Sequence, residues 1–159
     1  MLTTAERNEM IAKIAALPAQ LEALVSPLTV HQLTTHFLAG EWSVAQNVHH
    51  LADSHMNSFL RLKLVLDEDN IVFKPYNQDH WASMPDADNM EIGDSLNLLR
   101  GLHRRWVRLF ESLSDEQWQR TGLHPEYQRL YTVDDILRIY SAHGEGHLEQ
   151  IQRTLAAGA

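Results

Sequence analysis

His143 and His147 lie four residues apart in the stretch YSAHGEGHLEQIQ, residues 140–152. In an α-helix, residues i and i+4 project from one face, so both imidazoles would point the same way, as a pair of metal ligands requires. The stretch is not the zincin motif, because Gly144 follows the first histidine and Glu145 comes one position too late. The spacing leaves two interpretations open: a metal-binding pair, or two solvated or capping histidines.

A metal site of this kind needs a third protein ligand, and the segment NVHHLADSHMN, residues 47–57, contains His49, His50 and His55. His55 falls in the apolar stripe of this segment, which favours a hydrogen-bonded core histidine. His50 lies on the opposite side, in a polar stripe whose other members are Asn47, Ser54, Asn57 and Arg61. Periodicity favours a solvent-exposed face for this stripe, whereas the functional interpretation is a polar cleft.

The elements that carry these residues are predicted to be helices. Hydrophobic residues recur at helical spacing in four long segments, approximately 4–25, 44–66, 95–113 and 133–156. Three of these segments begin at residue pairs typical of a capping box: Thr3 with Glu6, Ser43 with Gln46, and Thr132 with Asp135. Strand-like alternation is sparse. We therefore predict an all-α fold, a four-helix bundle, with residues 1–159 forming a single domain.

A long connection, residues 67–94, separates the second and third predicted helices. Loops of more than about 12–15 residues in compact domains are often functional or disordered. Because Phe73, Tyr76 and Trp81 lie within this segment, we expect it to be ordered. His80 in this loop and His124 in a later one are candidates for the rim of a cleft.

Composition excludes several classes of function. The net charge is −8 with neutral histidines and there is no basic run, which argues against nucleic acid as a partner. There is no cysteine, so the chain contains no disulfide, thiolate ligand or cysteine nucleophile. Because no stretch approaches the ~18 apolar residues of a membrane span and the N-terminus does not resemble a signal peptide, we expect no membrane association and a cytoplasmic protein.

The stretch GEWSVAQNVHHLADSHMNSFLRLKLVL resembles the DinB/YfiT-like family of candidate metal-dependent hydrolases and thiol transferases. The similarity continues through KPYNQDHW, LHRRW, HPE and the final HGEGHLEQI, and so covers nearly the whole chain. The family fold is a four-helix bundle, usually dimeric, so the resemblance implies a homodimer.

The resemblance also implies a ligand set. In the family, three histidines hold the metal. One lies on the second helix, eight residues after a tryptophan, and the other two lie on the fourth helix. Counted from Trp42, this rule selects His50 rather than His49, and the helical pair corresponds to His143 and His147. Asn47, Ser54 and Asn57 would then face a cleft, and Glu145 could orient a ligand histidine from behind.

These expectations lead to a metal-dependent enzyme with a three-histidine site for one divalent ion, Zn or Ni. Such an ion would activate water, as in a hydrolase, or a low-molecular-weight thiol of the bacillithiol type, as in an S-transferase. The substrate would be a small molecule. The alternative is a non-catalytic dimeric module for metal binding or stress response, since the sequence contains no clear general base beside the site.

Overall fold

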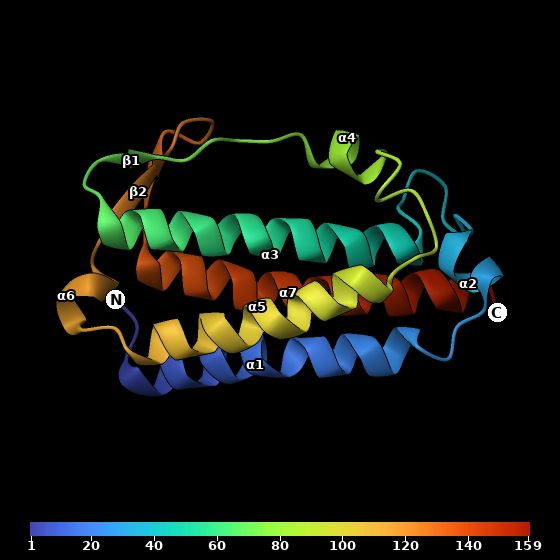
Figure 1. The fold of residues 1–159 in the computed structure, drawn as a ribbon, viewed down its shortest axis with the longest axis horizontal. Coiled ribbons are helices and arrows are strands. Elements are labelled where there is room, and N and C mark those ends of the chain that lie inside the picture. The colour runs from blue at the N-terminus through green and yellow to red at the C-terminus, as the bar shows by residue number, and fades with distance from the viewer.

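A computed structural model describes residues 1–159, and its four long helices lie side by side as a bundle (Figure 1). Their bounds are α1 (Thr4–Val25), α3 (Val44–Asp67), α5 (Gly93–Glu111) and α7 (Val133–Ala157). Both α1 and α3 pack against α5 and against α7. The four-helix bundle predicted from sequence is confirmed, and each helix begins and ends within two residues of the predicted bounds.

Side chains that precede three of these helices explain where they begin. Thr3, Ser43 and Thr132 each accept a hydrogen bond from the main-chain N–H three residues later. The side chain at that third position accepts one in return from the main-chain N–H of the capping residue. Such caps satisfy N–H groups that have no helical partner, and each is worth about 1 kcal/mol.

The interior consists of two groups of 13 buried apolar residues. Along each helix one group ends where the other begins: Leu51 belongs to one group and Phe59 to the other, as do Leu99 and Trp106. His55 lies between the first pair and is fully buried, so its predicted core position is confirmed. A polar layer of histidines therefore crosses the bundle between two apolar layers.

Shorter elements connect the helices. They are α2 (Val30–Thr34), α4 (Gln78–Ala82), α6 (Asp115–Trp118), β1 (Ile71–Val72), β2 (Thr121–His124) and β3 (Arg129–Thr132). The strands form a sheet in the order β1-β2-β3 at one end of the bundle, with β1 parallel and β3 antiparallel to β2. This small sheet is an addition to the predicted helical fold, because strands of two to four residues are too short to produce a recognisable alternation.

The connection from α3 to α5 is ordered, as predicted, and runs along α3 (Figure 1). Gln46 Nε2 donates a hydrogen bond of 2.9 Å to the carbonyl of Ala82, and Arg61 Nη2 donates one of 2.7 Å to that of Lys74. As a result, Asn47 and Ser54 are only 0% and 4% exposed. The solvent-exposed face that periodicity favoured for the polar stripe is wrong, because this connection covers it.

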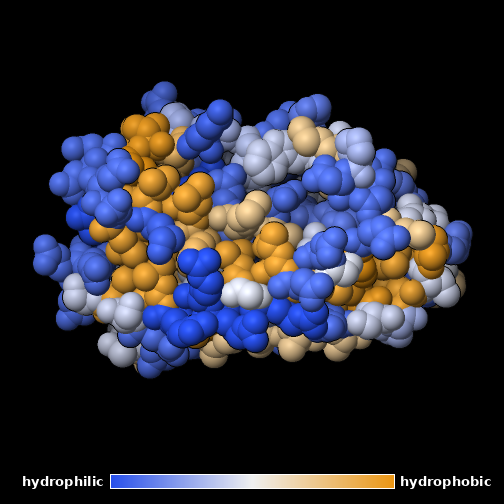
Figure 2. Space-filling model, in the orientation of Figure 1, coloured by the Kyte–Doolittle hydropathy of each residue, from blue (hydrophilic) through white to orange (hydrophobic).

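Figure 2 shows hydrophilic residues beside apolar ones over α5, and Arg100, Arg104, Arg105 and Arg108 of this helix are exposed. These arginines lie opposite the buried residues Leu99, Trp106 and Phe110 of the same helix. This division explains the amphipathic pattern of α5. None of the helices combines the length and the apolar character needed to cross a lipid bilayer.

Candidate metal centre

His50 of α3 and the pair His143 and His147 of α7 converge between the two helices. The Nε2 atom of His143 lies 3.3 Å from Nε2 of His50 and 3.2 Å from Nε2 of His147. One ligand atom from each histidine lies within 4.8 Å of the other two. The helical spacing of the α7 pair and the packing of α3 against α7 thus bring the three predicted ligands together.

The separations of the nitrogen atoms suit a metal ion. Two imidazole nitrogens bound at 2.0–2.1 Å in tetrahedral geometry are about 3.3–3.4 Å apart, close to the two short separations around His143. Imidazole nitrogens are ligands for Zn, Ni, Cu and Fe rather than for Mg or Ca. The donor set and its spacing therefore fit a divalent transition-metal ion.

A hydrogen-bond chain on one side determines the tautomer of His147. Asn47 Nδ2 donates to the carbonyl of Ser43 at 2.9 Å, so its Oδ1 atom faces Nδ1 of His147 at 2.8 Å. An amide oxygen only accepts, so His147 Nδ1 carries the hydrogen and the lone pair of a neutral imidazole is on Nε2. Partners of this kind behind a ligand histidine orient the ring and strengthen metal binding.

A longer chain determines the tautomer of His143. His103 Nδ1 donates a hydrogen bond of 2.6 Å to the carbonyl of Ile14, which only accepts, so the lone pair of neutral His103 is on Nε2. That atom accepts from His55 Nδ1 at 2.9 Å, and His55 Nε2 in turn accepts from His143 Nδ1 at 3.1 Å. The lone pair of His143 is therefore on Nε2, which faces the other two ligands.

This chain ends at a carbonyl that a proline makes available. In an α-helix the carbonyl of Ile14 would accept a hydrogen bond from the main-chain N–H of residue 18, but Pro18 has none. The carbonyl is thus free to accept from His103, which is 1% exposed. Neither Pro18 nor His103 has a predicted role from sequence, because the two residues lie on different helices.

Burial keeps the three ligand imidazoles neutral. It lowers the pKa of His50 and of His143 to about 3 in each case, with the neighbouring imidazoles adding to the effect, and it lowers the pKa of His147 to about 4. Burial also holds the pKa of His55 well below its usual range. At neutral pH the ligand nitrogens are therefore unprotonated, as metal binding requires.

An open pocket of about 380 Å³ gives access to the centre, with His143 and His147 in its wall. Trp42 lines the pocket too, and its ring is stacked on that of His147 at 6.2 Å. Asp79 of α4 and Glu41 are the carboxylates in the wall, and Glu41 is paired with Arg153. Asp79 was not among the predicted site residues, although its position beside His80 in the long connection was a usable signal.

Other predicted site residues lie apart from the three histidines. Glu145 is exposed and its carboxylate is 3.2 Å from Lys13 Nζ of α1, so it does not orient a ligand histidine. Ser54 and Asn57 lie on the covered face of α3 but form no hydrogen bond with the ligands, and His80 is exposed on α4. His124 lines a different cavity.

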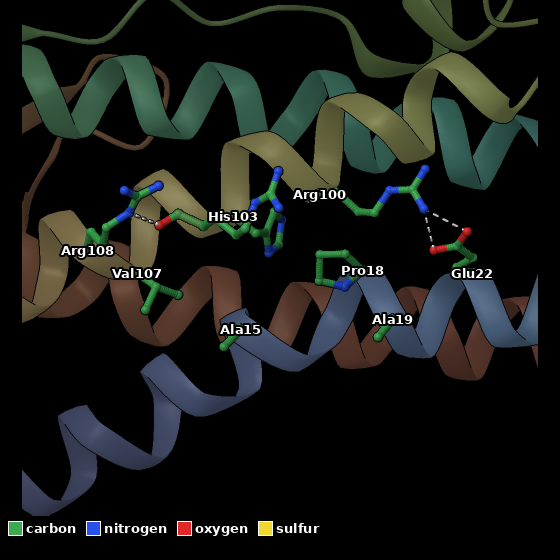
Figure 3. A pocket seen from close by; sticks show the side chains of 9 residues that line it. Ala15, Pro18, Ala19, Glu22, Arg100, His103, Val107 and Arg108 are labelled. Carbon is green, nitrogen blue, oxygen red and sulfur yellow. Dashed lines mark hydrogen bonds and ion pairs between the residues drawn. The ribbon is translucent and has the colours of Figure 1, made fainter.

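A larger groove of about 430 Å³ lies elsewhere, between α1 and α5 (Figure 3). Arg100 and Glu22 form an ion pair of 2.8 Å across it, and His103 and Pro18 line it. None of the three ligand histidines lines this groove. This groove is therefore separate from the smaller pocket beside the three histidines.

Residues 13–151, which include all three ligands, match the model of the DinB superfamily. The chain belongs to the DinB superfamily. One DinB relative, from Oceanobacillus iheyensis, is 43% identical over 144 residues, which are 91% of this chain and 83% of that protein. YfiT of Bacillus subtilis is 37% identical over 146 residues, with coverage of 92% and 82%. Both relatives are named as candidate metal-dependent hydrolases.

Solved DinB-like structures agree with the fold. The structure of YfiT from Bacillus subtilis has a TM-score of 0.94 at 35% identity and covers 97% of this chain and 88% of that chain. It is described as a four-helix bundle of unusual topology. The mycothiol-dependent maleylpyruvate isomerase has a TM-score of 0.58 at 18% identity, with coverage of 93% and 62%. That second likeness establishes a shared fold alone.

Proposed function

We propose that this protein is a metal-dependent enzyme in which His50, His143 and His147 hold one divalent ion, Zn or Ni. The observation that carries the proposal is the convergence of three Nε2 atoms, with the lone pairs of His143 and His147 directed inward by their hydrogen-bond partners. Three neutral ligands leave a divalent ion its full positive charge. An ion so held acts as a Lewis acid that lowers the pKa of a water molecule or thiol bound beside it.

The residues around the ion have separate tasks in this proposal. Asp79 accepts the proton that the nucleophile releases, because it lines the pocket and, unlike Glu41, has no ion-pair partner. Trp42 forms an apolar wall over His50 and His147, with ring centroids 4.6 and 6.2 Å away, and limits the access of bulk water. The substrate is a small molecule that enters through the pocket of about 380 Å³.

Hydrolysis is the reaction that the names of the close relatives favour, with water as the nucleophile. Transfer of a low-molecular-weight thiol is the second candidate, favoured by the fold shared with a mycothiol-dependent isomerase. Both reactions use the same ion and the same base, so the choice of nucleophile separates them. We propose that the enzyme acts as a homodimer in the cytoplasm, which light scattering and cell fractionation would test.

Elemental analysis of protein purified without a histidine tag tests the metal centre. We expect one equivalent of Zn or Ni per chain in the parent protein and less than a tenth of that in His50→Ala and His143→Ala. His49→Ala is the matched control, because His49 is adjacent on α3 and equally buried but bonds to Ser95. Unchanged metal content in both ligand variants would refute the site.

Activity assays then test the enzyme. The metal-loaded protein is assayed against ester and amide substrates and against thiols with an electrophile, beside Asp79→Asn. We expect turnover in one of the two panels and a loss of about 10²-fold or more in kcat for Asp79→Asn at full metal content. A loaded protein that is inactive in both panels would favour a non-catalytic metal-binding module.

A further inference from the structure

A second cavity, of about 160 Å³, lies between α3, α7 and the β2–β3 hairpin. Its wall combines aromatic rings with three polar side chains. Tyr127, Tyr131 and Tyr140 supply the rings, and Ser58, Arg61 and His124 supply the polar groups. The cavity lies at the far end of the polar stripe of α3, beyond His50, and the metal centre uses none of these polar groups.

All three polar side chains have a buried atom without a partner. These atoms are Oγ of Ser58, Nε of Arg61 and Nδ1 of His124. Only one other buried side-chain atom of the chain, in Trp106, shares this condition. A buried polar group without a hydrogen bond costs roughly 1–3 kcal/mol, so three around one cavity are unusual and indicate a site that a ligand completes.

The charge of the cavity is positive and uncompensated. Arg61 donates to the carbonyl of Lys74 and lies 5.3 Å from the ring of Phe73, but it has no carboxylate partner. Arg61 and His124 both line the cavity, and burial and the charge of Arg61 lower the pKa of His124. Exposed Glu126 is the acidic group that acts on His124.

We infer that this cavity binds the carboxylate of a small organic anion, with Arg61, Ser58 and His124 as donors to its oxygens. A carboxylate offers about four acceptor positions, which suits several converging donors, and an arginine edge binds it side-on. A single cation balances a monoanion, whereas a phosphate dianion would leave one negative charge unbalanced. The aromatic walls and a volume below the ~300 Å³ of whole-ligand pockets favour one planar end of a larger molecule.

Tyr140 connects the cavity to the metal centre. It lines the cavity, and its ring centroid is 5.5 Å from that of His143. Ser58 follows His50 by eight residues on α3, a rise of about 12 Å. We therefore assign the cavity to the carboxylate end of the substrate, about 12 Å along α3 from His50. This assignment rests on the proposed function, whereas carboxylate binding by the cavity does not.

Calorimetric titration with benzoate tests the cavity, using the full-length protein as purified and again after chelator treatment. Benzamide, the uncharged analogue of the same shape, is the ligand control. We expect one benzoate per chain in both preparations and at least about tenfold weaker binding of benzamide. Metal content is measured in the same samples.

Two variants and one matched control locate the binding. Arg61→Gln removes the cation, and we expect benzoate affinity to fall at least about tenfold. Ser58→Ala removes a hydroxyl that has no partner in the protein, so the fold is unaffected and affinity falls several-fold. Lys63→Gln removes an exposed charge from the same helix and leaves affinity unchanged.

Each contrary outcome has a distinct meaning. Equal binding of benzoate and benzamide, absence of benzoate binding, or unchanged affinity in both Arg61→Gln and Ser58→Ala would overturn the cavity assignment. Benzoate binding that requires the metal would place the carboxylate on the ion and would also overturn it. A parent protein that binds benzoate but no metal would refute the proposed function and leave the carboxylate site intact.

Discussion

Nδ1 of His103 donates a hydrogen bond of 2.6 Å to the main-chain carbonyl of Ile14, the carbonyl left free by Pro18. Through His55, this bond determines which nitrogen of His143 carries a hydrogen. The tautomer of His143, a proposed metal ligand on α7, thus depends on an irregularity in α1. Residues that never touch the ion are therefore expected to change its affinity.

His103→Phe tests this dependence at nearly constant volume. The ring no longer accepts from His55, so His55 and His143 lose their tautomer preference and metal affinity falls by about 10–100-fold. In His103→Gln the side-chain amide oxygen can still accept a hydrogen bond from His55 Nδ1, as His103 Nε2 does in the parent. This variant should therefore retain more metal affinity than His103→Phe. Side-chain ¹⁵N spectra of the metal-free protein should show Nδ1–H at His143 in the parent and a mixture in His103→Phe. If His103→Phe showed only Nδ1–H at His143, the hydrogen-bond chain would not determine this tautomer.

Asn47→Leu tests the other ligand support. Removal of the amide oxygen leaves Nδ1 of His147 without its acceptor at 2.8 Å, so we expect metal affinity to fall about 10–100-fold. Competition with a chromophoric chelator measures the change. Asn57→Leu is the matched control on the same face of α3, and its affinity should equal that of the parent. Equal affinities in all three proteins would show that Asn47 does not support the ligand.

Gly144 and Gly146 form a matched pair within HGEGH. A Cβ atom at residue 144 would lie 2.7 Å from Leu17 Cδ2 of α1, whereas at residue 146 nothing lies within 4 Å. Gly146→Ala should stabilise the protein by up to about 1 kcal/mol, the gain in helix propensity. Gly144→Ala gains the same propensity but overpacks the contact with Leu17, so it should be less stable than Gly146→Ala by about 1–3 kcal/mol. Urea unfolding measures both, and equal stabilities would argue against a required close approach of α1 and α7.

As the pH is lowered, the metal-free protein should lose stability at pH values well above those at which carboxylates titrate. Seven histidines have a lowered pKa in the folded state: His49, His50, His55, His103, His124, His143 and His147. As pH falls, the histidines of the unfolded chain bind protons near pH 6.5, while His50, His143 and His147 of the folded chain stay neutral until about pH 3–4. Stability is therefore complete above about pH 6.5 and falls below it.

The expected slope follows from the same linkage. Each such histidine contributes up to about 1.4 kcal/mol per pH unit once the unfolded chain is protonated. Urea unfolding at pH 7.0, 6.0 and 5.0 in the presence of a chelator measures how the free energy of unfolding changes with pH. His49→Gln should reduce the number of protons taken up on unfolding by up to about one. A free energy of unfolding that stays constant between pH 7 and 5 would contradict the burial of neutral imidazoles.

Local chemistry in the sequence was sufficient to predict the helices and to single out two of the three candidate metal ligands. Capping boxes at Thr3, Ser43 and Thr132 and the apolar periodicity define where three helices begin, because both act within a few residues along the chain. The i, i+4 spacing of His143 and His147 likewise needs only a helix. His50 was selected by family resemblance, since its own periodicity indicated solvent.

Tertiary packing decided what lies behind and beside these ligands. The 67–94 connection buries the polar stripe of α3, and no periodicity within α3 contains that information. The link from Pro18 through His103 and His55 to His143 joins all four long helices by hydrogen bonds between residues up to 89 positions apart. The cavity of Arg61 and His124 forms where a hairpin folds over two helices. The sequence specifies the chemical type of each residue, whereas the residues that contact it from other helices depend on how the whole chain packs.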